Sequence, residues 1–290
     1  MLTYELLGNA IVAGIFLGGF YAAISLGISL AFGLLDIVNI AHPVFVILGG
    51  YMVYLLNTKI GMDPILAGLL LTPVFYLLGL VVYYIYYNFF EKRGQESLRG
   101  LVFFFGVLFL IEVSLLLTYG VDYRLVHAPY IGETFTFGGI GVAYRLALPF
   151  ALGLMVTLAL YFFLSKTFLG RVIMGVSQDS WAVRLMGANP TRIKSIVFGL
   201  AIATASFAGS LLIIIGPIEP SLGREYIGRV FAVAVLGGMG SIGGTMIAAI
   251  ILGVAESLTS TFYGPAWAVV VSFGILLLVL AVRPAGLFGR

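Results

Sequence analysis

Long, unbroken apolar runs cover most of this chain and limit it to one kind of fold. A transmembrane helix needs about 20 consecutive apolar residues. Segments of this kind lie at 9–34, 64–90, 100–119, 146–164, 195–216 and 265–282. They are continuous, unlike the alternating segments of about ten residues that are typical of outer-membrane barrels. Two more apolar segments, 42–57 and 229–258, adjoin or contain polar interruptions. The sequence therefore predicts an all-α, polytopic transmembrane bundle with about eight or nine crossings and two broken or re-entrant helices.

Composition supports an integral membrane protein with a single domain over residues 1–290. Only 9% of the residues are charged, whereas soluble domains contain about 25%. The chain has no cysteine, which excludes disulfides, thiolate metal sites and a cysteine nucleophile. Its excess of basic groups lies in loops beside apolar segments, so we expect a lipid bilayer and not nucleic acid as the surrounding partner. No basic region precedes the first apolar run, so a cleaved signal peptide is not expected.

Basic residues predict how the chain is oriented. Ten of the fifteen Lys and Arg residues lie in the 91–99 loop, the 165–195 loop and the C-terminus. Because cytoplasmic loops carry an excess of Lys and Arg, these three segments are predicted on the cytoplasmic side and the N-terminus on the opposite side. The remaining basic residues are then predicted in loops on the opposite side: Lys59, Arg124, Arg145, Arg224 and Arg229. For the C-terminus to end inside, segment 229–258 must cross and return, with its hinge near 237–244.

Two polar breaks interrupt apolar segments, at DIVNIAHPVFVILGGY (36–51) and VLGGMGSIGGTMIAAIILGVAES (235–257). Irregular backbone in a membrane is tolerated where protein or a water-filled cavity covers it, and broken helices in two halves of a chain indicate a transport path. The candidate path residues are Asn39, His42, Gly237, Gly238, Ser241, Gly243 and Glu256. The alternative is that both breaks are ordinary turns whose glycines permit close helix packing. In that case Asn39 caps the helix that begins near Pro43. Glu112 is expected to be neutral and hydrogen-bonded in a helix interface.

The longest polar interval, 165–195, lies between two spans and is predicted to dock a partner. Its part SQDSWAVRLMGANPTRIKS (177–195) reads as a short amphipathic helix followed by a turn. Ser177 or Asp179 can cap this helix, and Gly187 with Asn189-Pro190 ends it. Its apolar anchors are Trp181, Val183, Leu185 and Met186, with Arg184 kept polar. Such a helix fits a groove in a partner; the alternative is a helix that lies on lipid.

Several function classes lack their motifs. There is no GxxxxGK[ST] phosphate loop, HExxH, CxxC pair or GxSxG, so we expect neither ATP hydrolysis by this chain nor another enzyme activity. An ion-coupled carrier or channel needs charged rings or a buried carboxylate relay. Glu112 and Glu256 are the candidates for such a relay.

Four blocks in order resemble one family. They are GGFYAAISLGISLAFGLLDIVNIAHPVFVILGGYM (18–52), GRVIMGVSQDSWAVRLMGANPTRIKSIVFGLAIATASFAG (170–209), FAVAVLGGMGSIGGTMIAAIILGVAES (231–257) and RPAGLFGR (283–290). The chain resembles the permease subunit of branched-chain amino acid ABC transporters, the LivH-type family. One departure is NIAHP (39–43), where family members commonly read NFAHG, so that Pro43 replaces a glycine.

The resemblance implies a bacterial inner-membrane subunit with a periplasmic N-terminus and a cytoplasmic C-terminus. It implies a second related permease, two cytoplasmic ATP-binding subunits that use the ATP, a periplasmic substrate-binding protein, and no cofactor in this chain. The implied ATPase-coupling residues are Asp179, Trp181, Arg184, Leu185, Gly187 and Asn189. The implied substrates are branched-chain or other amino acids, with urea, short amides and aromatic acids as the alternative.

Overall fold

The computed structural model describes residues 2–93, 97–137, 140–283 and 285–289, and it is a helical bundle. Within these residues, eight helices are long and apolar enough to cross a membrane. They are α1 (Leu2–Leu35), α2 (His42–Ile60), α3 (Pro64–Phe89), α4 (Ser97–Tyr119), α5 (Tyr144–Lys166), α8 (Pro190–Ile215), α10 (Ile242–Tyr263) and α11 (Pro265–Val282). The shorter elements are η1 (Glu91–Arg93), the hairpin β1 (Thr134–Phe137) and β2 (Ile140–Ala143), α6 (Phe168–Gln178), α7 (Ser180–Leu185) and α9 (Leu222–Gly237). The predicted polytopic all-α fold is confirmed.

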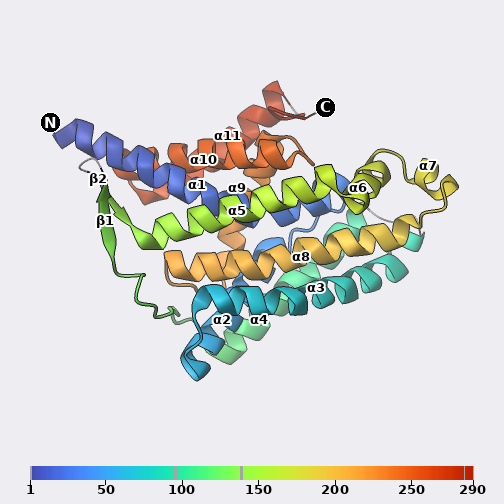
Figure 1. The fold of residues 1–290 in the computed structure, drawn as a ribbon, viewed down its shortest axis with the longest axis horizontal. Coiled ribbons are helices and arrows are strands. Elements are labelled where there is room, and N and C mark those ends of the chain that lie inside the picture. The colour runs from blue at the N-terminus through green and yellow to red at the C-terminus, as the bar shows by residue number, and fades with distance from the viewer. Residues whose placement is uncertain (1, 94–96, 138–139, 284, 290) are drawn as a thin grey trace.

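The bundle has two distinct ends (Figure 1). The N-terminus and the β1–β2 hairpin lie at one end, and α6 and α7 project from the other. Lys194 at the start of α8 pairs with Glu91 of η1, with 2.6 Å between Nζ and Oε1. In the C-terminal segment, the Leu287 amide donates to the Leu236 carbonyl, and Phe288 lines a cavity together with Gln178. The three basic segments that were predicted to share a side therefore gather at the α6–α7 end.

Helices α8 and α1 form the centre of the bundle, because most of their side chains are buried. Glycines allow their neighbours to approach closely. Gly209 of α8 faces the backbone of α2 at Gly49 and Gly50, and Gly199 lies against α3. In lipid, close packing of this kind replaces the hydrophobic effect as the main force between helices.

The first polar break is a re-entrant segment, as predicted. After α1 ends at Leu35, Asp36 adopts a left-handed backbone conformation with φ 57°. The chain then turns back into the bundle, and the His42 side chain reaches the Ile24 carbonyl, about three turns before the end of α1. Helix α2 therefore begins inside the bundle. Asn39 does not cap it: the N-cap is Ala41, and Asn39 Oδ1 instead accepts from the Ala41 amide at 3.1 Å.

The second break differs from its prediction. The predicted hinge is confirmed as a turn over 238–241 between α9 and α10, but this turn lies at the α6–α7 end, where Ser241 shares a cavity with Ser177 and Gln178. The irregular backbone inside the bundle instead precedes α9, because Gly223 in its first turn packs against Val44 at the start of α2. Helix α9 has 16 residues and is about 24 Å long, which is shorter than a bilayer core of about 30 Å. Its length explains why apolar runs alone misplace this break.

Candidate functional site

The first candidate site is the α6–α7 projection, and Asp179 fixes its shape. Asp179 follows α6 in an extended conformation, and its Oδ1 accepts from the backbone amides of Trp181 at 2.8 Å and Ala182 at 3.0 Å. This is an N-cap, so the predicted role of Asp179 is confirmed. Ser177 is not a cap, since it lies inside α6 and its hydroxyl donates to the Met174 carbonyl.

Three of the four predicted apolar anchors on and beside α7 are available to a partner. The side chains of Trp181, Leu185 and Met186 are 74%, 86% and 78% exposed. Val183 is buried, with Gly175 of α6 close beside it. The prediction of Val183 as an anchor is therefore wrong, because this side chain fastens α7 to its own protein.

The end of α7 is set by the residues that the sequence indicated. Gly187 has φ +87°, a conformation that glycine adopts without steric strain. Asn189 Oδ1 accepts from the Arg192 amide at 3.3 Å and caps α8, with Pro190 in the first turn. Asn189 thus both follows the α7 turn and starts the next span, which begins five residues earlier than its apolar run.

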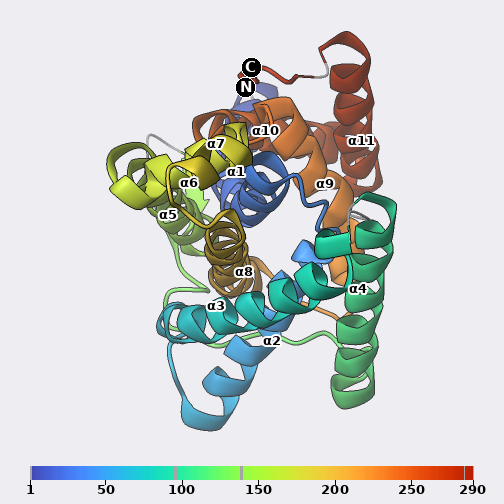
Figure 2. The same ribbon diagram turned by 90° about the vertical axis from the view of Figure 1, so that its right-hand side faces the viewer.

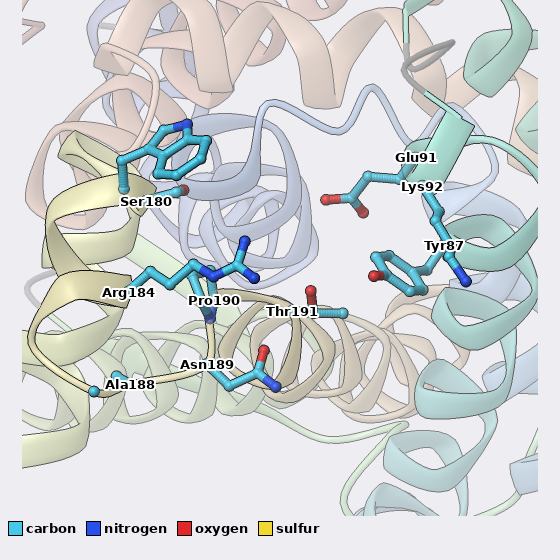
Figure 3. A pocket seen from close by; sticks show the side chains of 11 residues that line it. Tyr87, Glu91, Lys92, Ser180, Arg184, Ala188, Asn189, Pro190 and Thr191 are labelled. Carbon is cyan, nitrogen blue, oxygen red and sulfur yellow. The ribbon is translucent and has the colours of Figure 1, made fainter.

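A cavity of about 850 Å³ lies between α7 and the end of α3 (Figure 3). Ser180, Trp181 and Arg184 form one side, and Tyr87, Glu91 and Lys92 form the other. Arg184 also lies over the Trp181 ring, with 5.9 Å between the guanidinium carbon and the ring centroid. The projection therefore presents a charged hollow beside an exposed apolar helix, as a docking site for a partner requires.

We expect Asp179→Ala to destabilise α7 by about 1 kcal/mol, the usual effect of losing an N-cap. Asp179→Asn keeps an acceptor oxygen and should have little effect. Hydrogen exchange at the Trp181 and Ala182 amides measures the difference. Equal protection in both variants would show that the cap does not hold the helix.

The candidate path residues do not form one site in the structure. Asn39 and His42 are buried inside the bundle, at 1% and 0% exposure. His42 Nε2 must donate to the Ile24 carbonyl at 3.0 Å, since a carbonyl only accepts. Among the described residues, His42 Nδ1 and Asn39 Nδ2 have no hydrogen-bond partner. This segment thus carries two buried polar atoms whose hydrogen-bonding capacity is unused.

The other candidates lie around the α9–α10 turn. Ser241 and Gly243 line a second cavity of about 680 Å³ at the α6–α7 end, and Ser241 also caps α10 by accepting from the Gly244 amide at 3.2 Å. Gly237 packs against Thr245 and Gly238 against Gly289. Gly237 and Gly238 thus lie in close backbone contacts, and all four residues stay predicted path residues.

Glu256 belongs to a closed network. Its Oε1 accepts from Arg229 Nε at 3.1 Å and from the Ser272 hydroxyl, and its Oε2 accepts from the Tyr21 hydroxyl. Glu256 is 3% exposed. Because both oxygens are satisfied and no solvent reaches them, the geometry indicates a structural role and gives no support to its predicted place in the path.

Arg229 and Arg224 were assigned to the loops on the outer side, and the structure places both in α9. Arg224 pairs with Glu112 of α4, with 2.6 Å between Nη2 and Oε1. Glu112 thus lies between helices as predicted, but it forms an ion pair with Arg224 in place of the predicted neutral, hydrogen-bonded state. The available signal was the sequence LGREYIGR (222–229), in which two arginines directly precede an apolar run.

Comparisons with known proteins agree with this architecture. The family model described as "Branched-chain amino acid transport system / permease component" matches residues 10–280. The chain belongs to this family. It is therefore a transport permease component. No solved structure matches the chain significantly.

Several relatives are similar along nearly the whole chain. The high-affinity branched-chain amino acid transport system permease protein BraD of Pseudomonas aeruginosa is 29% identical, over 97% of this chain and 95% of its own length. The corresponding protein LivH of Escherichia coli is 30% identical over 96% and 94%. The probable branched-chain amino acid transport permease protein LivH of Methanocaldococcus jannaschii is 25% identical over 92% and 87%.

Proposed function

We propose that this permease is a membrane subunit of an ABC importer that moves amino acids across the bacterial inner membrane. Its main proposed substrates are branched-chain amino acids. The similarity to BraD and LivH, which extends over at least 96% of the chain, carries this proposal. The family match over residues 10–280 includes the α6–α7 projection together with the spans on both sides of it. The proposed assembly contains a second related permease, two ATP-binding subunits and a periplasmic substrate-binding protein.

In this proposal α7 transmits the motion of the ATPase subunits. A helix capped by Asp179 and ended by Gly187 holds Trp181, Leu185 and Met186 at fixed positions. Exposed apolar side chains on a short rigid helix suit a groove in a partner. The α7 end is then cytoplasmic, in agreement with the basic residues gathered there, and the N-terminus is periplasmic. ATP is used by the partner subunits, and this chain needs no cofactor.

Binding of ATP would close the ATPase subunits and push α7. Val183 and the α6 contact pass this push to α5 and α8, which continue into the membrane on either side of the projection. The re-entrant segment before α2 would then move against α1 and open the path alternately to each side. The route of the solute near Asn39, His42, Ser241 and Gly243 is part of this proposal.

Uptake of radiolabelled leucine into cells that contain the complete transporter tests the function. We expect Arg184→Asp/Leu185→Asp to reduce uptake about 30-fold, because loss of a central interface contact costs about 2 kcal/mol. Stimulation of the ATPase should fall with it, while the amount of inserted permease stays unchanged. Arg283→Asp, an exposed charge directly after α11 and outside the 165–195 interval, is the matched control and should retain uptake.

Two results would contradict the proposal. Uptake of urea, short amides or aromatic acids in place of amino acids would exclude the proposed substrates. Normal leucine uptake by the Arg184→Asp/Leu185→Asp variant would exclude α7 as the coupling element.

A further inference from the structure

Helix α9 carries a charged pair that the proposed function does not yet use. Arg224 in its first turn contacts Glu112 of α4, and their side chains are 55% and 10% exposed. Glu112 lies seven residues before the end of α4 at Tyr119, which places it about 10 Å from that end. Gly223, next to Arg224, packs against Val44 in the first turn of α2. The pair therefore lies within the depth of the spans.

An arginine in this position cannot face acyl chains. A charged side chain in the bilayer is expensive, and it faces a water-filled cavity or another protein. Figure 2 shows α11, α9 and α4 along one flank of the bundle, with α9 between the other two. The half-exposed guanidinium thus marks this flank as a surface that borders water or protein at the level of Arg224.

The pair has unused binding capacity for both signs of charge. Glu112 Oε2 is buried and has no hydrogen-bond partner among the described residues. No side chain caps the α9 N-terminus: the N-cap residue, Ser221, accepts from no helix amide, and its hydroxyl donates to Glu219 at 2.6 Å. A helix N-terminus and a guanidinium both favour a carboxylate. A free carboxylate oxygen favours an ammonium group.

The second charged pair of α9 shows the contrast. Arg229 and Glu256 are 14% and 3% exposed, and the Tyr21 and Ser272 hydroxyls occupy the Glu256 oxygens. That pair is closed to a ligand. Both pairs consist of one arginine and one glutamate. Their surroundings therefore make Arg229–Glu256 a structural pair and Arg224–Glu112 a binding pair.

We infer that Arg224, Glu112 and the N-terminus of α9 form a binding site in the translocation path for the zwitterionic group of an α-amino acid. The substrate carboxylate binds Arg224 and the first turn of α9, and the substrate ammonium binds Glu112 Oε2. This inference rests on the proposed function and narrows its substrate class. Urea and neutral amides carry neither charge, so the site selects against them. The site recognises the ammonium and carboxylate groups that all α-amino acids share. Other residues must then discriminate among amino acid side chains.

A double-substitution experiment separates this role from a structural ion pair. In cells with the complete transporter and leucine well below its half-saturating concentration, Arg224→Gln and Glu112→Gln should each reduce uptake about 30-fold, since a hydrogen bond to a charged group contributes about 1.5–3 kcal/mol. The double variant should stay equally low, because the substrate charges still find no partners. Arg145→Gln, an exposed arginine at the opposite end from α7, should keep uptake. Membrane levels of all variants are measured in parallel.

A purely structural pair gives the opposite result. Replacing both partners of an ion pair with neutral residues is often harmless, whereas breaking it by removing one is destabilising. Recovery of leucine uptake in the double variant would therefore overturn the site and leave the proposed function intact. A wild-type transporter that imports urea but no amino acid would instead overturn the proposed function.

Thiol labelling provides a second, independent measurement. The chain has no cysteine, so Arg224→Cys introduces a single reactive group. We expect a water-soluble sulfonate thiol reagent to label it in the complete transporter. Labelling only by a membrane-permeant reagent would place position 224 against lipid and overturn the inference.

Discussion

Arg229→Ala is expected to destabilise the permease by about 3–5 kcal/mol, the usual effect of removing one partner from a buried ion pair. The substitution leaves the Glu256 carboxylate 3% exposed and without its cation. The Tyr21 and Ser272 hydroxyls remain as donors, but they do not neutralise the charge. In the purified protein in detergent, Tm should fall by about 10 °C, and less folded protein should be recovered from membranes.

The matched control for this prediction is Arg229→Met/Glu256→Gln. It removes both charges and approximately keeps both side-chain volumes. The glutamine oxygen accepts from one of the two hydroxyls, and the glutamine NH2 group donates to the other. Because no uncompensated charge remains, we expect most of the lost stability to return. A single variant as stable as the wild type would show that water reaches Glu256, and the closed network would then be the wrong description.

The sequence was sufficient for features that depend on local pattern. Apolar length predicts the spans, since a helix must cross about 30 Å of hydrocarbon. The cap at Asp179 and the stop at Gly187 also depend only on neighbouring residues. These are short-range rules, and the structure agrees with them.

Short-range rules cannot predict which charged residues form ion pairs across the bundle. Glu112 and Arg224 are far apart in the sequence, and nothing local to either residue indicates the other. The orientation prediction, which counts basic residues in loops, put Arg224 and Arg229 on the outer side. The reason is that α9 is too short to be recognised as a span. Within α9 the two arginines are five positions apart, which directs them to different neighbours: α4 for Arg224 and α10 for Arg229.

The apolar pattern of α7 shows a related limit. The segment predicts an amphipathic helix, but α7 has only six residues, fewer than two turns. In so short a helix, periodicity cannot tell which apolar side chain packs inward. Only the position of α6 shows that Val183 is buried while Leu185 is free.

Gly209→Leu is expected to destabilise the protein by about 3 kcal/mol through overpacking between α8 and α2. A Cβ atom at position 209 would lie 2.5 Å from the Gly50 amide nitrogen and 2.9 Å from the Gly49 carbonyl carbon. Both are backbone atoms of a helix, so neither can rotate away. The two helices must separate, and α2 carries His42 in its first turn, so leucine uptake should fall together with Tm.

Gly106→Leu in α4 is the matched control, because a Cβ at that position meets nothing within 4 Å. The substitution introduces the same side chain into the middle of another apolar helix, and leucine has the higher helix propensity by somewhat less than about 1 kcal/mol. The purified permease should therefore keep or slightly raise its Tm. If Gly209→Leu and Gly106→Leu shifted Tm equally, the cost would come from the leucine itself, and the close approach of α2 and α8 would not be what holds the re-entrant segment in place.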